Sequence, residues 1–298
     1  MIGVVVIEWR SSEYLERLLA DIRSRSVGVV VIVRHQPRAA APTSWREHIP
    51  DGARLVVEEV PTNPGYAAGI NLGVRAAIRA GADALVVCND DLRLANDCVD
   101  LLADSALRMP GGIAGPLTLG SDGTVQTAGV DLDWSSPRIV RHRLTSSAET
   151  APVDSLQGHC LAFSAQTFRR LGPWDEVFFH MWEDTEFCTR LLDARCILVG
   201  AAGCEHIGNG AFGSPKTYSA VLEYMLIRNM FRFVSIRGGG RMRLLQLRDQ
   251  WIDRAGSESF RGGDVGERAV AERVARLAWR DFLDQRFGRW PAEVQCLA

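Results

Sequence analysis

The sequence predicts an α/β protein with a mostly parallel central sheet that is flanked by helices. Two observations predict this class. Over the first 110 residues, short apolar and β-branched runs alternate with segments in which apolar side chains recur every three or four positions. The apolar runs show no polar alternation, which is typical of strands covered by helices on both faces. Strand and helix in alternation favour right-handed crossovers, and therefore parallel strands.

The first half contains four expected strands, at residues 4–7, 27–33, 55–57 and 85–88. Between the first two, residues 11–25 have helical spacing, with Ser11 or Ser12 as the expected N-cap. Between the third and fourth, residues 63–82 combine small residues with an apolar stripe. This second helix is expected to pack tightly on the sheet.

The second half differs in texture. Residues 111–158 are rich in Gly, Ser, Thr and Asp, and after Pro215 the chain turns helical. We therefore expect one domain at 1–214, with halves at 1–110 and 111–214, and a helical C-terminal extension at 215–298. The shorter elements expected here are strands at 113–116 and 124–130, helices at 217–234 and 265–287, and a linker at 254–264.

Composition narrows the function classes. The net charge of −2 gives no electrostatic reason to expect nucleic acid as a partner. No apolar run approaches the ~18 residues of a membrane span, and the apolar start of the chain is too short for a signal peptide. Seven cysteines without a CxxC pair indicate reduced, mostly buried thiols. We therefore expect a cytoplasmic protein.

Two adjacent acids end the fourth strand, in the stretch LVVCNDDL at residues 85–92. Ligands of parallel sheets bind beyond the carboxyl ends of the strands, where Asp90 and Asp91 are expected to lie. Alone, the pair fits either a polar turn or a cation site.

A second acidic cluster, Glu183, Asp184 and Glu186, opens a predicted helix. Acids in a first helical turn are favoured by the helix dipole, which is a purely structural explanation. The aromatic residues just before them, Trp182 included, favour a catalytic one, because a carboxylate that loses hydration gains a raised pKa suited to a general base. Farther on, His206 follows a strand-like segment, and it is either an ordinary histidine or a residue facing the same cleft as Asp91.

Several motifs occur in order over residues 1–233: NPGYAAGINLGVRAA, NDDL, GPLTLGSDGTVQTAG, the stretch from GHCLAFS to WEDTEFCTRL, EHIG and YMLIRNMFRF. Together they resemble the family 2 glycosyltransferases, especially the rhamnosyltransferase-like branch. The resemblance implies a GT-A fold, with a nucleotide-sugar-binding half at 1–110 and an acceptor half at 111–214. It also implies inversion at the anomeric carbon, Mn²⁺ or Mg²⁺ as cofactor, a nucleoside-diphosphate sugar as donor and a hydroxyl-bearing acceptor.

The resemblance also implies roles for individual residues. Asp91 matches the last acid of the family's DxD-type motif and would bind the metal, with His206 as a metal or diphosphate ligand. Asp184 would take the proton from the acceptor hydroxyl, and Glu183 would help to bind or orient that acceptor. The residues matched to the donor site are Asn63, Gly65, Gly69, Asn71, Asn89 and Asp90. For Gly69, close packing of helix on sheet is an equally good explanation.

The sequence departs from the family pattern at the ends of two expected strands. Glu8 stands near the end of the first strand, and Arg34 and His35 stand where an acid usually accepts a hydrogen bond from the base. Arg has only donors, and His accepts only when neutral. Four explanations remain open: Glu8 supplies the acceptor, backbone carbonyls do, the base is a different one, or the donor site has decayed in a non-catalytic relative.

Two explanations remain open for each of the other candidate residues. His159, His180 and Trp182 line the acceptor pocket or are ordinary packing residues. The Arg-rich helices between Arg228 and Arg254 contact an anionic membrane peripherally at its inner face, or they form a solvated face. The combined prediction is an inverting, metal-dependent glycosyltransferase acting in polysaccharide, glycolipid or natural-product biosynthesis, with rhamnose as one candidate sugar.

Overall fold

The structure is a computed structural model, and it describes residues 1–9, 14–109, 111–133, 138–141, 150–191, 196–207, 219–256 and 265–297. The chain forms two compact units. The first comprises Met1–Asp175 and Glu183–Gly208, and the second comprises Glu176–Trp182 and Asn209–Ala298. The boundary expected between residues 214 and 215 lies outside the described residues. A short segment of the predicted acceptor half, Glu176–Trp182, groups with the C-terminal helices.

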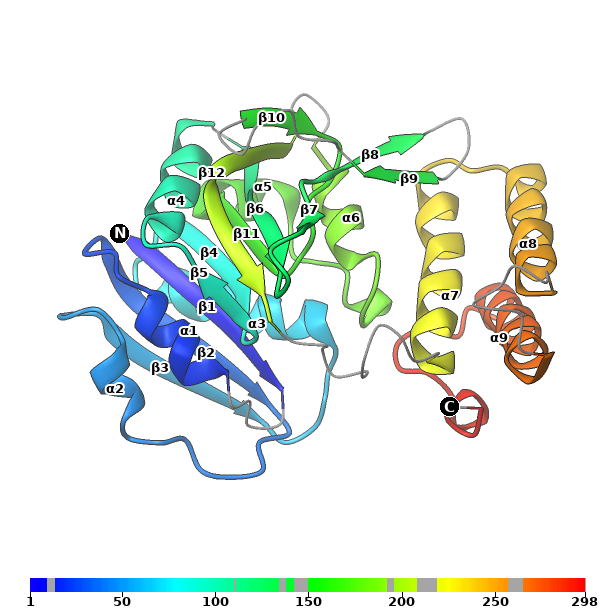
Figure 1. Cartoon of the computed structure of the whole chain (residues 1–298), viewed down its shortest axis with the longest axis horizontal. Coiled ribbons are helices and arrows are strands. Elements are labelled where there is room, and N and C mark those ends of the chain that lie inside the picture. The colour runs from blue at the N-terminus through cyan, green and yellow to red at the C-terminus, as the bar shows by residue number, and fades with distance from the viewer. Residues whose placement is uncertain are drawn as a thin grey trace. The chain divides into compact units, whose positions relative to one another are not determined.

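The first unit is built on a sheet in the order β10-β12-β6-β11-β4-β1-β2-β3, drawn in Figure 1. Its N-terminal strands β1 (Ile2–Trp9), β2 (Val27–His35), β3 (Arg54–Val60) and β4 (Ala84–Asn89) all run parallel to their neighbours within this set. The later strands are mixed. β11 (Cys160–Ser164) is antiparallel to β4 and to β6 (Ile113–Gly120), and β12 (Cys196–His206) is parallel to β6.

Short strands complete the architecture. β5 (Leu92–Leu94) pairs with β12, β7 (Val125–Thr127) pairs with β6, and β10 (Thr150–Val153) pairs with β12. β8 (Val130–Asp133) and β9 (Arg138–Arg141) form a separate hairpin. The expected strand at 124–130 is therefore interrupted: β7 ends at Thr127 and β8 begins at Val130.

Helices cover both faces of the sheet, as the unbroken apolar strands predict. Alternate residues of β1 such as Val4 and Val6 pack under α1 (Leu15–Asp21) and α4 (Cys98–Arg108), with Trp45 of α2 (Trp45–His48). Val5 and Val33 pack on the opposite face under α3 (Tyr66–Arg79). The same face holds Phe168 of α5 (Ala165–Leu171) and Phe187 of α6 (Glu183–Cys188). The α/β prediction is confirmed.

The predicted helices are shorter than their expected ranges. The expected caps Ser11 and Ser12 lie outside the described residues. At the next helix, Asn63 Oδ1 accepts the Gly65 N–H at 2.9 Å, and Gly65 adopts a φ of 98° as the N-cap of α3. This turn needs a glycine, so α3 begins at Tyr66 and not at residue 63.

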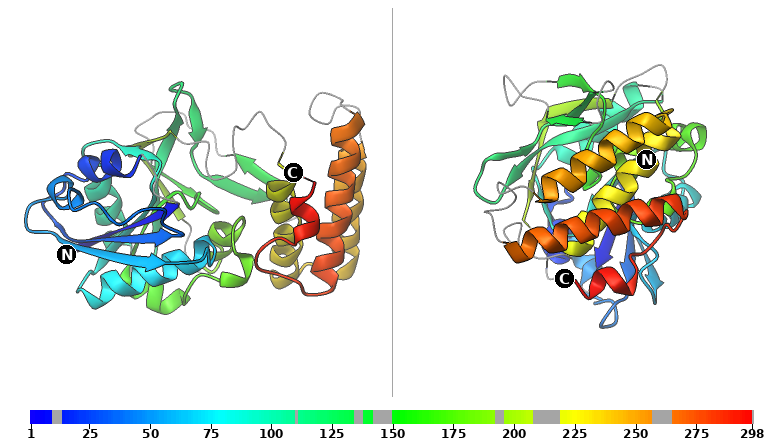
Figure 2. Two further views of the ribbon diagram at one scale, coloured as in Figure 1. Left: turned by 90° about the horizontal axis from the view of Figure 1, so that it is seen from below. Right: turned by 90° about the vertical axis from the view of Figure 1, so that its right-hand side faces the viewer.

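The second unit consists of α7 (Ala220–Ile236), α8 (Arg241–Gly256), α9 (Val265–Leu283) and α10 (Ala292–Gln295), with the short 3-10 helix η1 (Glu176–Phe178). Figure 2 shows α7, α8 and α9 from two further sides. Phe231 of α7 meets Trp279 and Phe282 of α9 with ring centroids 4.9 and 5.6 Å apart. In the described part of the chain, no helix combines the length and apolarity that crossing a membrane requires.

Candidate active site

The predicted metal ligands meet at the carboxyl ends of β4 and β12. Asp91 lies between β4 and β5, and β5 turns back to pair with β12, so that Leu92 is opposite His206. The Asp91 carbonyl also accepts the Ile207 N–H at 3.0 Å. These pairings bring Asp91 Oδ1 to 3.2 Å from His206 Nε2.

The pair fits a divalent cation. Both atoms are buried, and neither has a hydrogen-bond partner of good geometry among the described residues. Two adjacent ligands of an octahedral Mg²⁺ or Mn²⁺, each ~2.1 Å from the ion, lie about 3.0 Å apart, close to the observed separation. A mixed oxygen and nitrogen pair suits Mn²⁺ in particular. In the described ranges no group of three or more His, Cys, Asp or Glu side chains could hold a metal, so this pair would leave the remaining positions to substrate oxygens and water.

The two adjacent acids have different surroundings. Asp90 Oδ2 accepts the N–H of Trp9 at 3.0 Å and so ties the end of β4 to the end of β1. Burial, followed by the charges of Asp91 and Glu8, raises the pKa of Asp90 to about 7. Asp91 alone faces His206.

The ring of His159 packs against the ring of His206. The two imidazole rings stack with centroids 5.2 Å apart and an angle of 7° between their planes. His159 Nε2 lies 2.7 Å from Thr118 Oγ1 on β6. Burial and the neighbouring His206 lower the pKa of His159 to about 3, so the ring is neutral. Its carbonyl accepts the N–H of Asn89 at 2.8 Å, which joins this pair of rings to the end of β4.

Asp184, the predicted base, lies next to this assembly. Its Oδ2 accepts the N–H of Gly158 at 2.9 Å, and its Oδ1 accepts the N–H of Thr185 at 2.6 Å. Burial and the charge of Glu183 raise the pKa of Asp184 to about 6, although both hydrogen bonds act in the opposite direction. Consecutive residues therefore connect the two parts of the site: Gly158 holds Asp184, and His159 stacks on His206.

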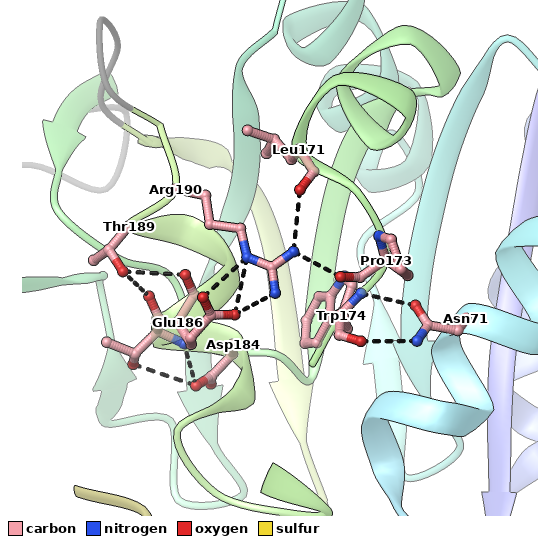
Figure 3. Close-up of polar contacts among 9 residues, drawn as sticks. Asn71, Leu171, Pro173, Trp174, Asp184, Glu186, Thr189 and Arg190 are labelled. Atoms are coloured by element: carbon pink, nitrogen blue, oxygen red, sulfur yellow. Dashed lines mark hydrogen bonds and ion pairs between the residues drawn. The ribbon is translucent and has the colours of Figure 1, made fainter. Parts of the chain in front are cut away.

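Other polar contacts fix α6, which carries the acids. Arg190 binds both carboxylate oxygens of Glu186 and donates to the carbonyls of Leu171 at 3.1 Å and Pro173 at 2.6 Å, as Figure 3 shows. Trp174 stacks on Phe187 of α6 with centroids 4.8 Å apart. Glu186 is thus an ion-pair partner of Arg190. Glu183, only 4% exposed, lies beside Asp184, and its charge acts on that carboxylate.

Asn71, predicted to bind the donor, is fully buried. Its Nδ2 donates to the Trp174 carbonyl and its Oδ1 accepts the Trp174 N–H, each at 2.9 Å (Figure 3). This reciprocal pair joins α3 to the loop before α6. Donor binding by Asn71 stays a prediction, and the structure adds a structural role.

Of the remaining donor-site candidates, some form a turn and one allows close packing. Asn63 and Gly65 make the turn that starts α3. A Cβ at Gly69 would stand 2.6 Å from two atoms of the His35 ring, so Gly69 makes room for that ring. Burial lowers the pKa of His35 to about 4, and a neutral imidazole can accept a hydrogen bond.

Arg34 is also buried, at 1% exposed, and forms ion pairs with Glu8 and Glu59 on the neighbouring strands. Its guanidinium lies 5.1 Å from the centroid of Trp45. The carboxylates of Glu8 and Glu59 therefore neutralise the positive charge of Arg34, the residue that stands where the family usually has an acid.

Two acceptor-pocket candidates, His180 and Trp182, belong to the second unit. Trp182 Nε1 donates to the Leu226 carbonyl at 3.0 Å, and its ring stacks on Phe233 with centroids 5.0 Å apart. The carbonyl of His180 accepts from Asn229 at 2.8 Å. Both residues therefore take part in the packing of that unit.

Sequence reasoning did not select Tyr66, Thr118 or Gly158. The Tyr66 hydroxyl donates to the Gly158 carbonyl at 2.7 Å, and Thr118 contacts His159. Tyr66 lies within the NPGYAAG motif, but the resemblance implies donor-site roles only for the glycines and asparagines of that segment. Gly158 directly precedes His159, but nothing in its type indicates a contact with an acid 26 positions later.

Comparisons with known proteins bear on the fold and the family. No family model matches the sequence. The hexosyltransferase Agl10 of low-salt glycan biosynthesis in Haloferax volcanii is 22% identical over 240 residues, which cover 77% of this chain and 74% of that protein. The N-acetylglucosaminyl-diphospho-decaprenol L-rhamnosyltransferase of Mycobacterium tuberculosis is 25% identical over 252 residues, covering 72% and 78%. The dTDP-rhamnosyl transferase RfbF of Shigella flexneri is 21% identical over 225 residues, covering 73% and 74%.

Solved structures show the same fold. GalNAc-T7, crystallised with UDP, GalNAc and Mn²⁺, matches with a TM-score of 0.62 at 14% identity over 96% of this chain, which spans 56% of that one. The mannosyltransferase PcManGT of Pyrobaculum calidifontis, in complex with GDP-Man and Mn²⁺, matches with a TM-score of 0.53 at 15% identity over 99% of this chain and 78% of that one. The predicted GT-A fold is confirmed, and so is the resemblance of the chain to hexosyl- and rhamnosyltransferases.

Proposed function

We propose that this chain is an inverting glycosyltransferase that moves a sugar from a nucleoside-diphosphate sugar to a hydroxyl group of an acceptor. The observation that carries the proposal is the arrangement around Gly158 and His159. On one side is a carboxylate with a raised pKa, Asp184, and on the other is the Asp91 and His206 pair with the spacing of cation ligands. A base and an anion-stabilising centre are the two parts that a single displacement needs.

Asp91 and His206 would hold Mn²⁺ or Mg²⁺. The ion would neutralise charge on the departing diphosphate, where negative charge develops during glycosyl transfer.

Asp184 accepts the proton of the acceptor hydroxyl. With a pKa of about 6 it is ionised at neutral pH, yet it is basic enough to take part in proton transfer. Its two backbone hydrogen bonds fix the carboxylate in place, so the direction of attack is set before the acceptor binds. Glu183, buried beside it, binds or orients the acceptor. Attack by the acceptor on the face opposite the diphosphate inverts the anomeric carbon.

For the sugar, we propose a hexose or a deoxyhexose such as rhamnose. Two of the relatives are named as rhamnosyltransferases and a third as a hexosyltransferase. The proposed acceptors are polysaccharide, lipid-linked or small-molecule hydroxyls, and one relative is named for a decaprenol-linked substrate.

We place the protein in the cytoplasm, with peripheral contact at the inner face of the membrane through the turn between α7 and α8. Ile236 at the end of α7 and Met242 at the start of α8 are 45% and 69% exposed beside this turn. Arg237, Arg241 and Arg243 flank them, and no acid occurs between Glu223 and Asp249. Exposed apolar side chains among cations suit an anionic lipid surface.

A thermal-shift screen tests the proposed function. Nucleoside diphosphates are added with and without Mn²⁺, and stabilisation that requires both supports a metal-diphosphate site. Asp91→Asn should remove the metal-dependent part, whereas Asp184→Asn should retain it and abolish sugar transfer. If no nucleoside diphosphate stabilises the protein with Mn²⁺, the proposal is wrong.

One observation favours a second candidate, a nucleotide-sugar-binding relative without turnover. Arg34 occupies the position of the family's base-binding acid and is neutralised by Glu8 and Glu59. Such a protein would bind nucleotide sugar without releasing nucleoside diphosphate, and its affinity would be the same for the Asp91→Asn variant. Release of nucleoside diphosphate by the wild type that is lost in Asp184→Asn rules this candidate out.

A further inference from the structure

The backbone and the ring of Tyr66 are each fixed by a neighbouring part of the structure. It is the first residue of α3, directly after the Asn63 and Gly65 turn. Its ring meets Trp174 edge to face, with centroids 6.4 Å apart. Trp174 is itself bonded to Asn71 through both backbone atoms. The hydroxyl therefore has a defined direction, toward the Gly158 carbonyl at 2.7 Å.

Gly158 passes this constraint to Asp184. The carbonyl of Gly158 accepts from Tyr66 and its N–H donates to Asp184 Oδ2 at 2.9 Å, so both of its polar backbone atoms are engaged. A Cβ at Gly158 would stand 3.1 Å from Asp184 Cβ and 3.5 Å from Tyr66 Cε1. The three residues are thus in close contact, and a side chain at Gly158 would press on Asp184.

The chemistry of Tyr66 suits a fixed donor. Burial, then the charges of Glu183 and Asp184, raise the pKa of Tyr66 well above its usual value. The phenol therefore stays protonated throughout the pH range in which Asp184 titrates. It donates to Gly158 whether Asp184 is charged or neutral.

We infer that Tyr66 is a positioning residue: its hydroxyl fixes Gly158, and Gly158 in turn fixes the carboxylate of Asp184. The inference rests on the proposed function, because it assigns to Tyr66 the orientation of the proposed base. The same turn carries His159, which stacks on His206, so one hydroxyl contributes to the placement of both halves of the site.

Tyr66→Phe removes the hydroxyl and keeps the ring. Because the Gly158 N–H lowers the pKa of Asp184, a less constrained Gly158 should let that pKa rise. This is measured without turnover, by NMR titration of ¹³C-labelled Asp carboxyls, with Asp184→Asn assigning the signal. In a donor assay with Mn²⁺, which measures nucleoside diphosphate released from a panel of nucleotide sugars, kcat should fall about three- to tenfold with KM for the donor within twofold.

Tyr224→Phe is the matched control. It deletes a phenol hydroxyl that likewise donates a hydrogen bond of 2.7 Å, to Asp281 in the second unit, and that also accepts from Arg228 at 3.5 Å. It should leave both the Asp184 titration and kcat unchanged. Gly158→Ala approaches Asp184 from the other side, and it should lower kcat further than Tyr66→Phe does.

The outcomes separate the two claims. If the wild type releases nucleoside diphosphate and Tyr66→Phe matches Tyr224→Phe in both kcat and the Asp184 titration, the inference alone is overturned. If the wild type shows no turnover with any nucleotide sugar, the proposed function fails and takes the inference with it. A raised Asp184 pKa with a reduced kcat in Tyr66→Phe alone supports the inference.

Discussion

Replacing Asn71 with alanine should destabilise the first unit markedly, because two buried hydrogen bonds disappear at once. Both amide atoms of Asn71 bond the backbone of Trp174 at 2.9 Å, and Asn71 is fully buried while Trp174 is 1% exposed. A neutral hydrogen bond contributes ~0.5–1.5 kcal/mol, and a buried backbone group left without its partner costs ~1–3 kcal/mol. We expect Asn71→Ala to lower the free energy of unfolding by about 2–4 kcal/mol.

The assay is urea unfolding followed by tryptophan fluorescence, with a thermal melt beside it. The expected loss corresponds to a Tm lower by about 4–16 °C for a domain of this size. Asn96→Ala is the control, since Asn96 is exposed and bonds only to the exposed Arg23 among the contacts seen, at 3.1 Å. A loss within about 0.5 kcal/mol of that control would refute the structural role. Nucleoside diphosphate affinity, measured well below the melt, then decides whether Asn71 also binds the donor.

Three further results are expected. Transfer activity should fall about tenfold per pH unit below pH about 6, because the Asp184 carboxylate must be ionised to accept a proton; activity that stays level down to pH 4.5 would exclude Asp184 as the base. Asn229→Ala should speed hydrogen exchange in residues 176–182 by about ten- to a hundredfold, since the Asn229 amide donates to three carbonyls there at 2.7–2.9 Å; unchanged exchange would contradict the role of this amide. Replacing the three Arg residues at the junction of α7 and α8 (237, 241 and 243) with Gln should weaken sedimentation with phosphatidylglycerol vesicles about a hundredfold, whereas the same change at two Arg residues of α9 (273 and 276) should not; equal effects would exclude a specific docking surface.

The central part of the fold could be predicted from the sequence because the signals were local. Apolar runs and helical spacing located β1 to β4, α1 and α3, although the ends were set by details such as the Gly65 turn. The order of NDDL and EHIG placed Asp91 and His206 at strand ends, and the 3.2 Å contact agrees with that placement. Tyr66 and Gly158 could not be found in this way. Their contact joins residues 92 positions apart, and it depends on how α3 packs rather than on residue type.

The separation of Asp90 from Asp91 also required the structure. Adjacent residues at a strand end are indistinguishable in a sequence pattern, whereas in the fold one bonds to Trp9 and the other faces His206. Likewise, the departure at Arg34 looked in the sequence like a missing acceptor. In the fold, two acids lie on the neighbouring strands, Glu8 on β1 and Glu59 on β3, and both form ion pairs with Arg34. Base recognition by Glu8 would therefore have to compete with a buried ion pair.

The buried acids and histidines of the site have opposite effects on stability. Asp90 and Asp184 have pKa values raised to about 7 and about 6, so between these values and 3.8 the folded protein holds protons that the unfolded chain lacks. Through that range their contribution to stability grows as the pH falls. His35 and His159 have pKa values lowered to about 4 and about 3, so from 6.5 downward the unfolded chain holds protons that the folded protein lacks, and stability falls with pH.

Near pH 5 two protons are gained and two are lost on folding, and these four groups should leave the stability of the metal-free protein nearly level. His35→Gln removes one histidine from the balance. Its free energy of unfolding should therefore rise on acidification from pH 6 to pH 5, by up to ~1.4 kcal/mol for the unmatched proton. Urea unfolding at both pH values, with His48→Gln at a partly exposed histidine of α2 as control, measures this difference. A wild-type change of more than ~1.4 kcal/mol per pH unit, or a His35→Gln profile identical to that of the wild type, would show that these buried groups do not titrate as their surroundings require.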